Sequence, residues 1–150
     1  MANEAEWTYA TQVTLEASGT SAANAAFAAA DDTTLASAGH SNYPYADFVL
    51  KTVGFSATLG SSKYIGLYRR ALNADTASGD AVAPGTSNKV QYVGAFTIPD
   101  VQASTGTTYF TLEDVPIIED QEFWIENQTG VTVNAGWTLK VRPKTLVPGA

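Results

Sequence analysis

Six of the fifteen acidic residues of the chain lie between positions 113 and 126. They are Glu113, Asp114, Glu119, Asp120, Glu122 and Glu126. Glycoside hydrolysis and many calcium sites require paired carboxylates. The group therefore raises the hypothesis of a glycosidase-like enzyme, which Glu122→Gln would test by loss of activity on a polysaccharide.

A structural role explains the same acids without catalysis. Glu122 and Glu126 alternate with apolar residues, so they are expected on the outward face of a strand. Lys140 and Arg142 are expected on the outward face of the last strand. If the two strands pair, the four side chains form an ion-pair ladder, in which each exposed pair contributes at most about 1 kcal/mol. We favour this ladder over an active site.

Other catalytic patterns are missing from the sequence. His40 is the only histidine, there is no cysteine, and no GxSxG, GxxxxGK[ST] or GxGxxG motif occurs. Asn73, Asp75 and Asp80 lack the spacing of a calcium loop. We therefore expect no enzyme activity, no cofactor and no metal.

The net charge is −7 and the sequence pI is about 4.4. An acidic chain repels phosphate backbones and anionic lipids, so nucleic acid and membrane partners are not expected. The beginning MANEAEW has no basic or apolar region of a signal peptide. No apolar run reaches the roughly 18 residues of a membrane span. Production in a cytoplasm fits the absence of cysteine.

Alternation with a period of two residues predicts strands as the elements that carry these side chains. Strands are expected at 7–17, 47–59, 63–71, 89–98 and 107–112. The expected core side of 47–59 is Val49, Val53, Phe55, Ala57 and Leu59, with Phe48 and Leu50 opposite. The expected core side of 89–98 is Val90, Tyr92, Phe96 and Ile98.

The C-terminal part is predicted to end in a β-meander at 121–143, because two turn signals interrupt its alternation. Its expected core residues are Phe123, Ile125, Trp137, Leu139 and Val141. The tail after Pro143 is expected to be peripheral.

The alanine-rich stretch 22–30 admits two interpretations. Alanine favours a short helix. An extended arm on a neighbouring subunit is the alternative, because Phe27 is the only large anchor. This stretch and the long polar loop 72–88 are the candidate contact elements.

These elements predict an all-β fold: an antiparallel, jelly-roll-like β-sandwich with at most one short N-terminal helix. Residues 1–46 are expected to hold a first strand, the alanine-rich arm and a loop, packed on the same domain. Residues 47–145 form the expected sandwich core, and 146–150 form a tail.

Several large side chains are expected on outward strand faces. Tyr64, Tyr68 and Arg70 alternate with Ile65 and Leu67, and Trp124 lies among the acids. Aromatic residues and arginine are enriched in protein interfaces. We therefore predict Tyr64, Tyr68, Arg70 and Trp124 as interface anchors.

Four segments resemble a family of small virion proteins of tailed bacteriophages. They are YIGLYRR at 64–70, YVGAF at 92–96, DQEFWIEN at 120–127 and AGWTLKV at 135–141. The resemblance covers about residues 47–145. It implies a β-sandwich structural protein of the particle, such as a capsid cement (decoration) protein that trimerises on the shell, or a head-fibre or tail component.

The expected function is that of a non-enzymatic cement protein, which binds the major capsid protein as a homotrimer and stabilises the outer shell. The chain would be made in the host cytoplasm and reside in the virion. The alternative is a tail, head-fibre or receptor-binding β-sandwich that recognises carbohydrate.

Overall fold

The computed structural model describes residues 5–35, 42–72, 83–89, 91–98, 100–117 and 120–148. The regular secondary structure in these ranges consists of β-strands alone. They are β1 (Ala5–Tyr9), β2 (Val13–Gly19), β3 (Phe27–Leu35), β4 (Tyr45–Gly54), β5 (Lys63–Ala71), β6 (Tyr92–Ile98), β7 (Thr105–Pro116), β8 (Gln121–Gln128) and β9 (Trp137–Pro148). Within these residues, no helix is long and apolar enough to cross a membrane.

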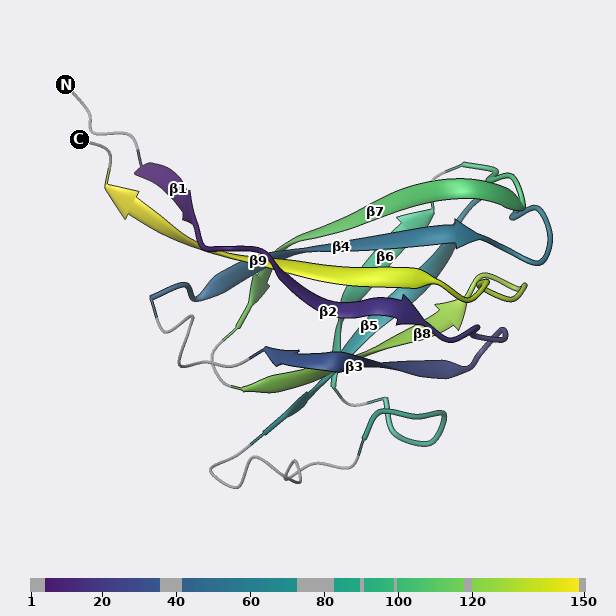
Figure 1. Cartoon of the computed structure of the whole chain (residues 1–150), viewed down its shortest axis with the longest axis horizontal. Coiled ribbons are helices and arrows are strands. Elements are labelled where there is room, and N and C mark those ends of the chain that lie inside the picture. The colour runs from purple at the N-terminus through teal and green to yellow at the C-terminus, as the bar shows by residue number, and fades with distance from the viewer. Residues whose placement is uncertain are drawn as a thin grey trace.

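The strands form two antiparallel sheets that pack face to face (Figure 1). The first has the order β1-β9-β4-β7, with β2 also paired to β9, and the second has the order β3-β8-β5-β6. The pairs nest, since β2 meets β9, β3 meets β8, β4 meets β7 and β5 meets β6. This is a hairpin rolled into a jelly roll, so the predicted fold class is confirmed.

The core lies between the two sheets, where every strand except β1 contributes buried side chains. The rings of Phe48 in the first sheet and Phe123 in the second meet with centroids 5.0 Å apart. Each fully buried side chain of this size contributes about 1.5–3 kcal/mol by leaving water. The largest fully buried residues include Leu15, Leu50, Ile65, Leu67, Phe96, Ile98, Ile125 and Trp137.

The predicted meander at 121–143 is wrong, although its core residues are confirmed. Phe123 and Ile125 in β8 and Trp137, Leu139 and Val141 in β9 are buried. The two strands, however, belong to opposite sheets. The intervening segment crosses from one sheet to the other. Alternation cannot distinguish the two arrangements, since each strand buries one face in both.

The helix predicted at 22–30 is also wrong. Residues 27–35 form the edge strand β3, which pairs with β8 and places Ala28 opposite Ile125. Helix propensity is a weak prior, and here pairing overrides it. Ala28 and Ala30 are buried against the other sheet. The segment is extended, as the alternative expected, but it pairs within its own chain, and a contact with a neighbouring subunit stays a prediction.

The predicted strand 7–17 is divided at residues 10–12 into β1 and β2, and both parts pair with β9. The tail after Pro143 is part of a strand, because β9 continues to Pro148, which lies opposite Ala5. β1 and the end of β9 project together beyond the sandwich (Figure 1). We call residues 5–9 and 144–148 the projecting ribbon.

The core face of the fourth strand differs from its prediction. Phe48 and Leu50 are fully buried, whereas Val53 is 37% exposed. Phe55 and Leu59 are buried as expected. The alternation changes side at Gly54, which has a φ of +139° and lies at an irregularity of the pairing with β7. A backbone of this kind favours glycine.

Candidate functional site

The outer face of the second sheet gathers all four predicted interface residues. Alternate residues of β5 face the core, so Tyr64, Tyr68 and Arg70 point outward. In the neighbouring strand β8, Trp124 lies directly opposite Tyr68. The structure therefore brings Tyr64, Tyr68, Arg70 and Trp124 onto one face, and their role as interface anchors stays a prediction.

Glu126 lies at the centre of this face and is only 1% exposed. The Tyr68 hydroxyl donates to its Oε2 at 2.7 Å, and Gln128 Nε2 donates to its Oε1 at 2.7 Å. Lys89 forms an ion pair with the same carboxylate. Burial alone would raise the pKa of Glu126, but the hydrogen bonds from Lys89, Tyr68 and Gln128 lower it. The carboxylate is thus ionised and fully engaged in holding its neighbours.

Tyr68 points away from the core as predicted, but neighbouring side chains cover it, and only 5% of its surface is exposed. Its ring packs edge-on against Phe27 at 5.0 Å and Tyr92 at 5.3 Å between centroids. The ring also covers Gly66, where a Cβ would lie 2.9 Å from it. Burial and the hydrogen bond to Glu126 raise the pKa of Tyr68 well above its usual value. From beneath the surface of this face, Tyr68 therefore holds Phe27, Tyr92 and Glu126 together.

Arg70 and Trp124 form a second group on this face. The guanidinium carbon of Arg70 lies 5.4 Å from the centroid of the Trp124 ring. Arg70 Nε also donates to Glu122 Oε2 at 3.0 Å. Both Trp124 and Arg70 are partly exposed. This arrangement keeps a planar cation and an indole ring accessible together.

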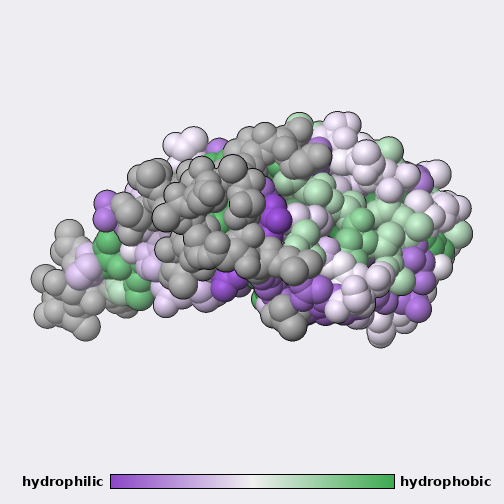
Figure 2. All heavy atoms as spheres, turned by 90° about the horizontal axis from the view of Figure 1, so that it is seen from below, coloured by the Kyte–Doolittle hydropathy of each residue, from purple (hydrophilic) through white to green (hydrophobic). Residues whose placement is uncertain are grey.

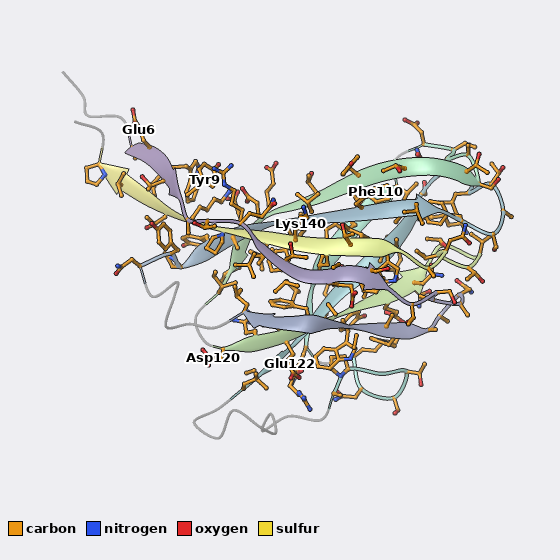
Figure 3. All side chains as sticks on the ribbon, in the orientation of Figure 1. Glu6, Tyr9, Phe110, Asp120, Glu122 and Lys140 are labelled. Atoms are coloured by element: carbon orange, nitrogen blue, oxygen red, sulfur yellow. The ribbon has the colours of Figure 1, made fainter. Side chains whose placement is uncertain are left out.

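The predicted ion-pair ladder is wrong, because its two halves lie on different sheets. Figure 3 shows Glu122 on the second sheet and Lys140 on the first. Glu122 pairs with Arg70 instead. Arg142 lies over the Tyr9 ring, 4.3 Å from its centroid. Glu122, Glu126 and Arg142 therefore have partners other than the predicted ones.

The group of acids at 113–126 does not converge on one site. Asp114 belongs to the first sheet and pairs with Lys144 at 2.6 Å, whereas Glu122 and Glu126 lie on the second. Glu119 lies outside the described residues. The described part of the chain contains no group of three or more His, Cys, Asp or Glu that could hold a metal ion.

Two weaker sequence candidates also lie outside the described residues: His40 and the acids at 75 and 80. Most of the predicted contact loop 72–88 falls there too.

A shallow groove of about 330 Å³ lies on the outer face between Tyr64 and Tyr92. Tyr92 was predicted to face the core but is 52% exposed. A pairing irregularity between Leu67 and Tyr68 shifts the register of β6 at this point, so simple alternation fails. Phe96 and Ile98, further along the same strand, are buried as predicted.

The projecting ribbon forms a separate candidate surface. Every residue of β1 is exposed. Trp7 is 41% exposed, and Leu146 in β9 is 52% exposed. At the base of the ribbon, Lys144 is 4% exposed and pairs with Asp47 at 2.5 Å. Its Nζ also lies 4.4 Å from the centroid of the Trp7 ring. Lys144 therefore fixes the ribbon to the body of the sandwich.

Burial alone would lower the pKa of Lys144, but the hydrogen bonds that its amine donates to Asp114 and Asp47 raise it. The amine is therefore charged over the whole physiological range, and the base of the ribbon stays paired.

Sequence reasoning missed Phe27, Lys89 and Ala95 as parts of the outer face. Phe27 had a signal, since it is the only large residue in an alanine-rich stretch. Lys89 and Ala95 had none, because their contacts depend on strand pairing.

Comparison with models of known protein families and with curated proteins found no match. The resemblance to phage virion proteins over 47–145 therefore stays a prediction.

Proposed function

We propose that this chain is a non-enzymatic structural protein of a phage particle, which acts as a cement protein on the outer capsid shell. It binds the major capsid protein as a homotrimer, and it resides in the virion after synthesis in the host cytoplasm. The projecting ribbon is the observation that carries the docking step, and the segments that resemble phage virion proteins supply the context.

Within the described residues, the strands of the projecting ribbon pair only with each other beyond Lys144. Tyr45, the first residue of β4, lies opposite Lys144, so the end of β9 beyond that point pairs only with β1. An isolated two-stranded ribbon is at best marginally stable in water. Its open edges offer unpaired N–H and C=O groups to another chain. A partner that pairs with these edges would stabilise it.

The side chains of the ribbon suit a protein partner. Trp7, Tyr9 and Leu146 are exposed together at this end of the molecule, and Figure 2 shows hydrophobic residues there. Aromatic residues that are partly buried in a free protein are typical anchors of interfaces. We therefore place the contact with the shell at the ribbon.

Stabilisation of the shell follows from mass action. A protein that binds only assembled subunits favours assembly by RT ln(1 + [L]/Kd), which is about 2.7 kcal/mol at one hundred times Kd. A trimer engages several shell subunits at once, and the linked contacts raise the effective affinity.

Co-sedimentation with purified shells tests the proposal. The wild-type chain should sediment with the shells, and light scattering should give the mass of three chains. The double variant Trp7→Ala/Leu146→Ala should bind at least about tenfold more weakly, because it removes two exposed anchors. Tyr109→Ala is the matched control, since Tyr109 is 65% exposed on β7, outside the ribbon. A wild-type chain that never sediments with its own shell would contradict the proposal.

The second candidate is a carbohydrate-recognising tail or head-fibre component. The exposed rings of Tyr64 and Tyr92 beside the groove favour it. Tyr68, one of the four predicted interface anchors, is buried and cannot contact a glycan directly.

A further inference from the structure

The groove on the outer face arises from the order of side-chain sizes along two paired strands. Tyr64 lies opposite Thr97, and Tyr68 lies opposite Tyr92. Between these rows, Gly66 lies opposite Ala95. The Tyr68 ring covers Gly66, so the depression lies over Ala95, between the Tyr64 and Tyr92 side chains. Its volume of about 330 Å³ is within the range of small-molecule sites.

The lining combines aromatic rings with hydroxyl groups. Tyr64 is 40% exposed and Tyr92 is 52% exposed, and Ala95 lies between them. Ser62 and Thr97 add hydroxyls to the lining. Within the described part of the chain, neither the Tyr64 nor the Tyr92 hydroxyl forms a hydrogen bond. The groove therefore offers apolar ring faces and free donors side by side.

The Tyr92 wall of the groove is held in place before any ligand arrives. Tyr92 packs edge-on against Tyr68, and the Tyr68 hydroxyl is fixed by Glu126. Burial raises the pKa of Tyr92, and the nearby Tyr64 and Glu126 raise it further, so its phenol keeps its proton at neutral pH. A preorganised wall reduces the ordering cost of binding.

The chemistry of the lining excludes several ligand classes. Among the described residues, no carboxylate lines the groove, and Lys63 is the only charged residue of the lining. One lysine in a chain of net charge −7 is a poor site for a phosphate backbone. An amphipathic helix would need an apolar groove, and here hydroxyl groups interrupt the apolar surface.

We propose that this groove binds a neutral pyranose unit of a polysaccharide. A pyranose has an apolar C–H face that can stack on a tyrosine ring, and hydroxyls at its edge that can bond to Tyr64, Tyr92 and Thr97. The site lies on the second sheet, whereas the ribbon belongs to the first. Saccharide binding is therefore independent of docking on a shell.

A printed array of neutral oligosaccharides, namely glucans, galactans, mannans and N-acetylhexosamine oligomers, tests the proposal. The wild-type chain should bind at least one, and titration calorimetry should then give its affinity. Tyr64→Ala and Tyr92→Ala should each weaken binding at least about tenfold, because each removes one wall. Tyr64 is exposed, so the circular dichroism and urea unfolding of Tyr64→Ala should stay close to the wild type. Tyr92 also packs against Tyr68, so Tyr92→Ala should unfold at a lower urea concentration but keep the wild-type circular dichroism.

Two controls separate this site from other surfaces. Tyr109→Ala removes an exposed tyrosine of the first sheet and should leave saccharide binding unchanged. The ribbon variant Trp7→Ala/Leu146→Ala should lose shell binding but keep saccharide binding. The proposal is overturned if no neutral oligosaccharide binds, or if both groove variants bind as the wild type does. Binding restricted to acidic glycans and abolished by salt would overturn it as well.

Discussion

Replacing Gly19 with alanine should destabilise the fold by about 3 kcal/mol, the upper part of the usual range for overpacking. A Cβ at this position would lie 2.0 Å from Cε2 of Trp137. That ring is fully buried, and its Nε1 donates to the Thr20 carbonyl oxygen at 2.7 Å. The indole cannot move without breaking this hydrogen bond and displacing the core.

The sign of the effect is informative, since alanine in a strand ordinarily adds about 0.5–1 kcal/mol of stability over glycine. Urea unfolding followed by tryptophan fluorescence gives the free energy of unfolding. Gly60→Ala is the control, because a Cβ there meets nothing within 4 Å. A Gly19→Ala protein as stable as the wild type would show that Trp137 is not packed as described.

Glu126→Gln should cost about 1.5–3 kcal/mol at neutral pH, the range for hydrogen bonds to a charged group. The carboxylate accepts from Tyr68 and Gln128 and pairs with Lys89. A glutamine offers one acceptor oxygen and turns an amide towards other donors. The outer face should loosen as Tyr68 loses its fixed partner.

We also expect the stability difference between the wild type and Glu126→Gln to depend on pH. Because the folded-state pKa of Glu126 is lowered, its contribution is complete above the unfolded value of about 4.3 and is lost as the pH falls through the folded value. The difference between wild type and Glu126→Gln should therefore shrink towards zero in acid. Unfolding curves from pH 7 down to pH 3 measure it.

Glu122→Gln is the matched control on the same strand and face. Glu122 is partly exposed and pairs with Arg70, so its loss should cost no more than about 1 kcal/mol. Equal costs for the two variants, or a Glu126→Gln difference that does not change with pH, would refute the central role of Glu126.

Local patterns predicted much of the fold. The strand expected at 63–71 agrees with β5 at both ends, and the buried faces of β8 and β9 follow from alternation. The partner of each strand did not follow, because a jelly roll pairs residues far apart in sequence. Gln121–Gln128 and Trp137–Pro148 read as neighbours but lie in opposite sheets.

The outer face of the second sheet was predicted only in part, because alternation gives the direction of a side chain but not its neighbours on other strands. Alternation correctly directs Tyr64 and Tyr68 away from the core. The burial of Tyr68 depends on Phe27 and Tyr92, which reach it only through the pairing of β3, β8, β5 and β6. The position of Tyr92 depends on a register shift that no single-strand pattern reveals.

The two candidate surfaces belong to different sheets, which permits two independent contacts. The projecting ribbon extends the first sheet, and the saccharide groove lies on the second. A shell protein that docks through one surface would keep the other available to solvent.

An electron-microscopy map of the intact particle is the most direct test of the proposed cement role. We predict a jelly roll on the outer capsid surface, in groups of three, with the β1·β9 ribbon in contact with the major capsid protein. Absence of the chain from purified particles, or a ribbon that points into solvent with no protein neighbour, would contradict the proposal.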